Sequence, residues 1–327
     1  MRLECRQAFK KNATKRLAGD SQVVMLVITT CTNRKRKPVP ANLHMRALPS
    51  ASLSDVASDW ASRLGAANER FPAGEVYGGR GFREAAAASQ ELKARLLIVS
   101  AGLGLVDAST SIPPYACTIL VDAPDCVAAR VTGGVAAPDW WTALSRTSPF
   151  GVTLHNAAND SSGLIFAALS DAYIEMISGE LLALPLPILS RLRLFTRAPL
   201  ERVASQLRPF VMPYDDRLDG PDSPVPGTRS DFAGRALRHF ATVIMADGDA
   251  RSAAEHAASV VEEISKWRLP EAPNRIRYDD AFILALIRSH WDDVGGCSLR
   301  RLRGEFNIAC EQSRFRDLAR IVRIERA

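Results

Sequence analysis

The sequence predicts an α/β protein with a mostly parallel sheet flanked by helices, followed by a small helical module at the C-terminus. Apolar runs at 23–30 and 96–100 have the length and the Val, Ile, Leu and Thr content of buried strands. Helical segments lie between them, and alternation of strands with helices favours parallel strands joined by crossovers. Hydrophobic residues make up 47% and charged residues 24% of the 327 residues, as is typical of globular proteins.

Helix and strand signals continue in order along the first 268 residues. Ser54 is a capping residue type and begins a predicted helix at 54–64, and a second helix runs over 82–93 after a glycine-rich segment. Further strands are expected at 150–155, 164–168 and 192–196, and further helices at 172–184, 231–245 and 250–267. A stretch rich in Pro, Gly and Asp at 209–228 predicts a long loop or a boundary.

Composition shifts divide the chain into a basic arm (1–20), an α/β catalytic domain (21–268) and a helical module (274–327), the last two separated by a Pro-rich break. The module is predicted to hold helices at 279–289, 299–304 and 309–323, with a turn at Asn307. This pattern fits a helix-turn-helix laid on DNA. Its DNA contacts would come from Arg300, Arg301, Arg303, Arg314 and Arg316. The alternative is a helical cap on the main domain with solvated arginines.

Basic residues are concentrated at the start of the chain. Residues 1–46 hold eleven Lys and Arg against two acids, a net charge of +9, which leaves −3 for the rest. Open α/β sheets bind ligands where their strands end, and the first strand is directly followed by Arg34, Lys35, Arg36 and Lys37. These cations predict a phosphate clamp, the alternative being a solvated basic loop. Arg greatly outnumbers Lys, which suits phosphates and base edges but is also favoured by a GC-rich genome.

Several classes of protein are disfavoured. The six cysteines form no C-x-x-C pair and have no His at metal-binding spacing, so neither a zinc site nor a disulfide framework is expected. The run at 23–30 is a poor signal peptide, because no cleavage site follows it and the cations at 34–37 would stop translocation. No segment of about 20 apolar residues could span a membrane. We expect a cytoplasmic protein with no cofactor and no membrane contact.

A base-binding pocket is predicted around the end of the strand at 96–100. Ser100, Gly102 and Gly104 follow that strand, and the two glycines would let the backbone approach a ligand closely. The spacing lacks the third glycine of a dinucleotide fingerprint. Tyr77, Phe82 and Tyr115 would supply rings that stack on a planar base, the alternative being core packing.

A second group of polar residues could supply acid–base chemistry. Asp215 and Asp216 lie beside Arg217, in a segment that lacks the calcium-loop pattern. Arg229 precedes a helix on which Arg235 and His239 share a face near an N-terminus, a favourable place for an anion. Ordinary capping and ion pairing would explain the same spacing. His155 and Asn156 end a predicted strand, where they could orient water or a base.

Four motifs together resemble a known family. They are Thr30-Cys31-Thr32-x-Arg34-Lys35, Val76-Tyr77-x-Gly79-x-x-Phe82, the LIVSAGLGLV run at 97–106, and Pro114-Tyr115-x-x-Thr118. In this order they are similar to the DUF6884 proteins, which are related to the peroxide-stress protein YaaA and to a domain of archaeosine synthase. That resemblance implies a sheet of the uracil-DNA-glycosylase type. The length and the helical tail are also similar to bacterial anti-phage DNA glycosylases that remove glucosylated hydroxymethylcytosine from phage DNA.

The resemblance implies a DNA-binding enzyme that extracts a base. The expected activity is hydrolysis of the N-glycosidic bond of a modified base in double-stranded phage DNA, which leaves an abasic site. The base would be flipped into the ring-lined pocket while Asp215 or Asp216 stabilises the cationic sugar. A lyase would need a Lys nucleophile, and Lys35 is the only well-placed one, so a monofunctional glycosylase is favoured. The alternatives are a non-catalytic DNA-binding stress protein of the YaaA type and an RNA-modifying enzyme of the deazaguanine pathway.

Overall fold

The computed structural model describes residues 24–246, 248–271, 274–293 and 296–326. The chain divides into two compact units, one that ends at Pro270 and one that begins at Glu271, and each is considered by itself. This division falls inside the Pro-rich break at 269–273. The predicted basic arm at 1–20 lies outside the described residues.

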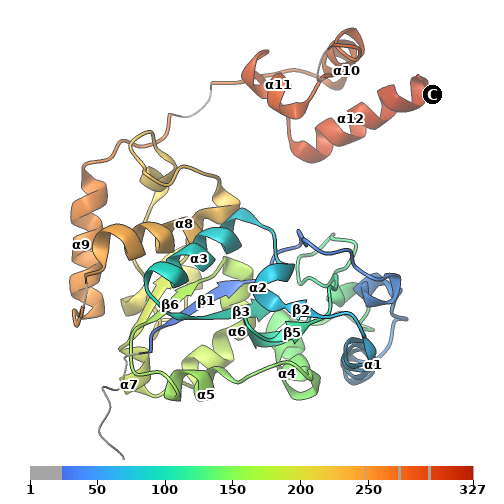
Figure 1. Ribbon diagram of the computed structural model, residues 1–327. Helices are drawn as coiled ribbons and strands as arrows, with labels where there is room; N and C mark the ends of the chain where they lie inside the picture. The colour runs from blue at the N-terminus through green and yellow to red at the C-terminus, as the bar shows by residue number, and fades with distance from the viewer. Residues whose placement is uncertain (1–23, 247, 272–273, 294–295, 327) are drawn as a thin grey trace, which may run out of the picture. The chain divides into compact units, whose positions relative to one another are not determined.

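A five-stranded sheet ordered β4-β3-β1-β6-β7 forms the centre of the first unit (Figure 1). Its parallel strands are β1 (Leu26–Thr30), β3 (Arg95–Ser100), β6 (Ile165–Ala168) and β7 (Leu192–Phe195). The fifth strand, β4 (Gly104–Asp107), pairs antiparallel with β3. The predicted α/β architecture with a mostly parallel sheet is therefore confirmed. Neither β4 nor the short pair β2 (Phe71–Pro72) and β5 (Ser111–Ile112) was predicted.

The sheet has a separate hydrophobic core on each face. In β1, Leu26 and Ile28 belong to one core while Val27 belongs to the other. Phe166 of β6 and Phe195 of β7 lie in the same core as Val27. Successive side chains of a strand point to opposite faces, so strands buried on both sides are apolar throughout. This is why their sequences read as continuous apolar runs.

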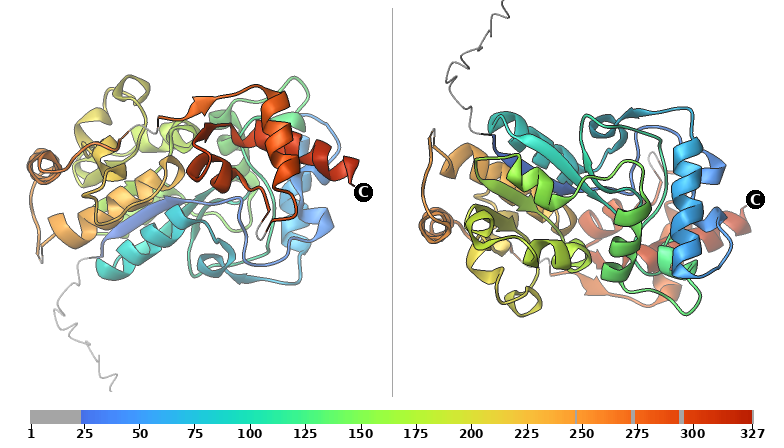
Figure 2. Two further views of the ribbon diagram at one scale, coloured as in Figure 1. Left: turned by 90° about the horizontal axis from the view of Figure 1, so that it is seen from above. Right: turned by 90° about the horizontal axis from the view of Figure 1, so that it is seen from below.

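Helices cover both faces of the sheet (Figures 1 and 2). The Leu26 face is covered by α1 (Leu53–Ala66), α4 (Ala137–Thr147), α5 (Leu154–Asn159), α6 (Asp171–Leu182) and α7 (Leu186–Leu189). The Val27 face is covered by α3 (Arg80–Glu91), α8 (Phe232–His239) and α9 (Ala253–Ser265). A short α2 (Ala73–Val76) precedes α3, and a π-helical turn at Phe240–Ile244 ends α8. Of these helices, α2, α4, α5 and α7 were not predicted.

Two local predictions are wrong. The expected strand at 150–155 is reduced to an isolated bridge between Val152 and Leu105, and α5 begins at Leu154. The Thr153 hydroxyl accepts a hydrogen bond from Asn156 N at 3.2 Å and so caps that helix. A short apolar run does not distinguish a strand from a buried helix. Ser52, rather than Ser54, caps α1 by accepting from Asp55 N at 3.3 Å.

The second unit contains α10 (Asp280–Ser289), α11 (Leu299–Gly304) and α12 (Gln312–Glu325) around Ile287, Leu302 and Val322. The three predicted helices are thus present. Between α11 and α12 the chain forms β9 (Ile308–Ala309), which pairs in parallel with β8 (Ile276–Arg277). Asn307, which has a left-handed backbone (φ 53°), directly precedes β9. The connection is therefore longer than the three or four residues that join the helices of a helix-turn-helix.

No helix in the part of the chain that the structure describes combines the length and apolar character that a bilayer crossing requires.

Arg193 on β7 points into the apolar Val27 face and is 1% exposed. Its Nε donates to His256 Nδ1 at 2.8 Å, and its other nitrogens donate to carbonyl oxygens, including Arg251 O at 2.7 Å. Because His256 Nδ1 accepts, the ring is neutral and its Nε2 donates to Asp249 at 3.0 Å. Burial lowers the pKa of His256, and burial also lowers the pKa of Arg193 to about 10.

We expect the free energy of unfolding to fall as the pH drops from 7.5 to 5.5. Burial lowers the pKa of both His256 and His239 in the folded protein, so the unfolded chain binds more protons below its own His pKa of about 6.5. Urea unfolding across this range would measure the slope. His256→Gln keeps an acceptor for Arg193 and should flatten the slope, whereas His155→Gln at an exposed position should not. Stability that is independent of pH over this range would contradict the expectation.

Candidate site at the carboxyl edge of the sheet

The carboxyl ends of β1 and β6 lie where the strand order reverses. From β1 the chain first builds β3 on one side and later β6 on the other. Open α/β sheets bind ligands at such a switch point, outside the carboxyl ends of the strands. Cys31 follows β1 there, and its Sγ lies 3.1 Å from the hydroxyl of Tyr173 on α6, the helix that follows β6. The residues that directly follow β1 therefore lie at the carboxyl edge of the sheet, where a ligand site is expected.

A buried hydroxyl network lies beside this point. The hydroxyls of Tyr77 and Tyr115 are 2.8 Å apart, and the Tyr115 hydroxyl also hydrogen-bonds Ser100 Oγ. Ser100 Oγ accepts in addition from the backbone N of Gly102 at 3.1 Å and of Leu103 at 3.0 Å. Burial raises the pKa of both phenols well above their usual value. They are therefore neutral at physiological pH.

The expected open, ring-lined base pocket is wrong. Tyr77 and Tyr115 are 0% exposed and Phe82 is 3% exposed, so no base could stack on them in this structure. The glycines have a structural explanation too. A Cβ on Gly102 would lie 2.7 Å from Tyr115 Cδ2, and Gly104 takes a left-handed backbone (φ 81°) where the chain turns into β4. The close approach that Gly102 permits is to the Tyr115 ring and not to a ligand.

Lys35 is part of the same network. Its Nζ donates to Thr32 O and lies 5.0 Å and 4.8 Å from the ring centroids of Tyr77 and Tyr115. Burial lowers the pKa of Lys35. Arg34 and Arg36 are exposed, while Lys37 is half-buried with Nζ 4.3 Å from the centroid of the Phe71 ring. The predicted four-residue clamp therefore offers Arg34 and Arg36 to an anion, whereas Lys35 turns inward.

The predicted carboxylates lie in a hollow of about 410 Å³ at the carboxyl end of β7. Asp215 is 46% exposed and pairs with Arg217 at 2.6 Å, and Asp216 is 51% exposed and pairs with Arg197. Tyr214 also lines the hollow, and its hydroxyl is hydrogen-bonded to His239 Nδ1 at 2.7 Å. Burial raises the pKa of Tyr214. Arg208 lines the hollow as well, which thus combines two carboxylates, two guanidinium groups and a phenol.

The carboxylates and the buried tyrosines do not form one site. In the order β3-β1-β6-β7, the end of β3 at Ser100 and the end of β7 at Phe195 are three strand spacings apart, or about 14 Å. The expected combination of Asp215 or Asp216 with Tyr77 and Tyr115 is therefore wrong, since strand order along the sheet separates them.

Other predicted site residues have structural roles or lie elsewhere. Arg235 is buried and pairs with Asp231 at 2.6 Å and with Asp219, so it does not face a ligand. His239 is also buried, whereas Arg229 is exposed where the turn before α8 begins.

His155 and Asn156 are exposed on α5 rather than at a strand end. At the start of α5, the backbone N of Leu154 donates to the carboxylate of Glu180. Glu180 lies near the end of α6, the helix that precedes β7 in the chain. Both side chains therefore lie on a short surface helix and not at the end of a strand.

Three of the five predicted DNA-binding arginines of the second unit make internal contacts. Arg301 pairs with Asp293 at 2.7 Å, Arg303 donates to Cys310 O at 2.6 Å and Arg314 pairs with Asp280 at 2.6 Å. Arg300 and Arg316 are exposed.

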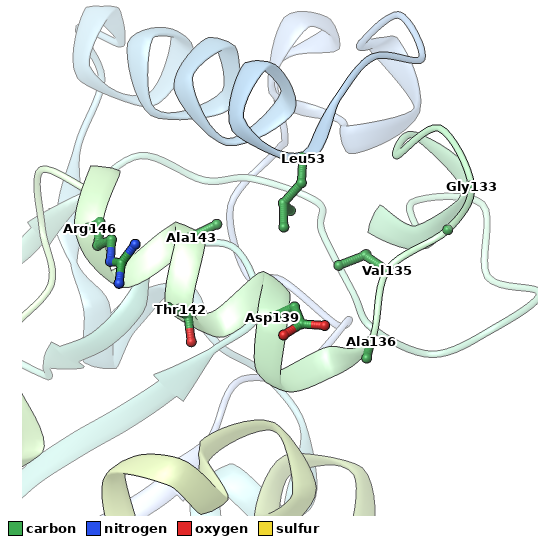
Figure 3. A pocket seen from close by; sticks show the side chains of 9 residues that line it. Leu53, Gly133, Val135, Ala136, Asp139, Thr142, Ala143 and Arg146 are labelled. Carbon is green, nitrogen blue, oxygen red and sulfur yellow. The ribbon is translucent and has the colours of Figure 1, made fainter.

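Sequence reasoning missed two features of the surface. Arg197 follows β7 as Arg34 follows β1, so the same strand-end argument could have identified it. Figure 3 shows a second hollow, of about 660 Å³, where Asp139, Thr142 and Arg146 of α4 line one side. Nothing in the sequence indicated it, because α4 itself was not predicted.

Within the described part of the chain, no three His, Cys, Asp or Glu side chains gather closely enough to hold a metal ion. Comparison of the chain with protein families, with curated proteins and with solved structures finds no match.

The Gly102→Ala substitution should destabilise the protein by about 1–3 kcal/mol, because its Cβ overlaps the buried Tyr115 ring. Gly179→Ala is the matched control, since Gly179 lies within α6 and a Cβ there meets nothing within 4 Å. That control should be neutral or stabilising by up to about 1 kcal/mol. Urea unfolding of both variants measures the difference. Equal stabilities would mean that the Tyr115 ring is free to move aside.

Proposed function

We propose that the protein is a monofunctional DNA glycosylase that removes a modified base, glucosylated hydroxymethylcytosine, from phage DNA in antiviral defence. The observation that carries this proposal is the hollow at the carboxyl end of β7, where Asp215 and Asp216 are exposed beside Arg197. Exposed Arg34 and Arg36 follow β1, two strands along the same edge, and suit the phosphates of a DNA strand. The choice of this activity follows the order of the four sequence motifs between residues 30 and 118.

The chemistry needs one carboxylate near the sugar and one group that activates water. The base departs with the electron pair of the N-glycosidic bond and leaves a cation-like sugar, which one carboxylate stabilises. The second carboxylate takes a proton from the water that attacks the sugar, and the departed base receives a proton in its place. Asp215 and Asp216 are adjacent in the hollow and fit these two roles. The base must leave the stack, and the hollow replaces the buried rings as the place that receives it. Lys35 points into the tyrosine network, so direct hydrolysis is favoured over a lyase.

One observation favours a non-catalytic DNA-binding protein instead. Each carboxylate already has a cationic partner, Arg217 for Asp215 and Arg197 for Asp216. A carboxylate neutralised in this way stabilises a sugar cation less well. An RNA-modifying enzyme of the deazaguanine pathway is the third candidate, and competition between duplex DNA and tRNA for binding would separate it from the other two.

Asp215→Asn and Asp216→Asn should each lower the rate of base excision by about 10²-fold or more, because each removes a carboxylate from the reaction. The assay incubates the full chain with duplexes carrying glucosylated hydroxymethylcytosine, hydroxymethylcytosine or cytosine and measures abasic sites with an aldehyde-reactive probe. Asp160→Asn, at an exposed residue that follows α5, is the control and should leave the rate unchanged.

The outcomes separate the candidates. Abasic sites only on modified duplexes, lost in the two Asn variants, would support the glycosylase. Salt-dependent DNA binding with no abasic sites on any duplex would refute it and leave the binding protein. Tighter binding of tRNA than of duplex DNA would favour the RNA-modifying enzyme.

A further inference from the structure

The second unit contains a hollow of about 560 Å³ that is unusually rich in arginine. Four guanidinium-bearing residues line it, namely Arg275, Arg277, Arg303 and Arg314. They come from the segment around β8, from α11 and from the start of α12. Ala309, Cys310 and Glu311 complete the lining. Residues distant in the sequence therefore converge on one concave surface within this small unit.

Backbone carbonyls hold three of the four guanidinium groups in place. Arg303 donates from Nε and from one terminal nitrogen to Cys310 O, at 3.0 Å and 2.6 Å. Arg275 Nε donates to Arg303 O at 3.2 Å, and Arg314 donates to Tyr278 O at 2.8 Å. A guanidinium has five N–H donors, so each of these groups keeps donors for a ligand. Groups fixed in this way lose little conformational entropy when an anion binds.

Positive charge in the hollow exceeds negative charge. Glu311 is the acidic residue of its lining, and Asp280 pairs with Arg314 at 2.6 Å. Four guanidinium groups thus face two carboxylates. Arg277 is exposed, so its side chain is accessible to a ligand. Gathering like charges around one concavity is unfavourable unless an anion neutralises them, and the planar fork of Arg matches the oxygens of phosphate.

We infer that this arginine hollow binds a backbone phosphate of the nucleic acid on which the protein acts. The inference rests on the proposed function for its choice of nucleic acid, and it changes which residues of the second unit make the contact. Arg275 and Arg277 join Arg303 and Arg314 as the phosphate ligands, whereas Arg300, Arg301 and Arg316 do not line the hollow. Inorganic phosphate offers the same oxygens to the guanidinium groups and is the alternative ligand for this hollow.

Arg277→Gln in the full chain should weaken binding to a fluorescent DNA duplex about 3- to 10-fold at 0.1 M salt. Loss of one phosphate contact should also reduce the slope of log affinity against log salt by about 1. Arg316→Gln removes the same charge at an exposed position outside the hollow and should change affinity less than 2-fold. Arg303→Gln should resemble Arg277→Gln once circular dichroism has shown that the variant is folded. Fluorescence anisotropy over a salt series measures all four proteins.

Equal effects of Arg277→Gln and Arg316→Gln would overturn the inference. A second result would also overturn it. If calorimetry shows that binding of inorganic phosphate depends on Arg277 while the affinity for DNA does not, the hollow binds the free ion and not the DNA backbone. Abasic sites measured in the same samples keep the two proposals apart. DNA binding that depends on Arg277 without abasic sites supports the hollow and refutes the glycosylase. Base excision by the protein, together with DNA binding that Arg277→Gln leaves unaltered, supports the glycosylase and refutes the hollow as a phosphate site.

Discussion

The turn at residues 100–104 is the constraint on which the first unit depends. The turn is enclosed in the core, and several of its polar groups are hydrogen-bonded there. Trp60 of α1 donates to Gly102 O, and Trp140 of α4 donates to Ala101 O, both at 2.7 Å. Together with the Tyr115 hydroxyl on Ser100, these bonds tie two helices to the end of β3. An unpaired buried polar group costs about 1–3 kcal/mol, so the turn and its partners stabilise one another.

This constraint divides the carboxyl edge of the sheet into a closed part and an open part. Around β3 and β1, rings and hydroxyls fill the space, and even Lys35 turns inward. At β7, two strands from β1, Asp215 and Asp216 are exposed in a hollow. The closed part fixes the end of β3 through its buried hydrogen bonds, and the open part holds carboxylates that are accessible to solvent.

Arginine has two different uses in this protein. Arg193 and Arg235 are buried and satisfy carbonyl, imidazole and carboxylate acceptors within the first unit. Their five donors make them efficient partners for such groups. In the second unit, guanidinium groups anchored on carbonyls instead surround a concave surface with excess positive charge. The number of arginines is therefore a poor guide to nucleic-acid binding, and their partners are a better one.

The sequence by itself determined the parallel strands and most of the helices, because their apolar periods are local properties of the chain. It also identified Arg34 as a residue that follows a strand, and Asp215 as part of a polar cluster in the segment rich in Pro, Gly and Asp. Only the tertiary structure decided that Tyr115 is buried, since an aromatic side chain has the same sequence signal in a pocket and in a core. It also decided that the ends of β3 and β7 are three strand spacings apart, with Asp215 in the hollow at the end of β7. Strand order depends on long-range pairing, which no local pattern encodes.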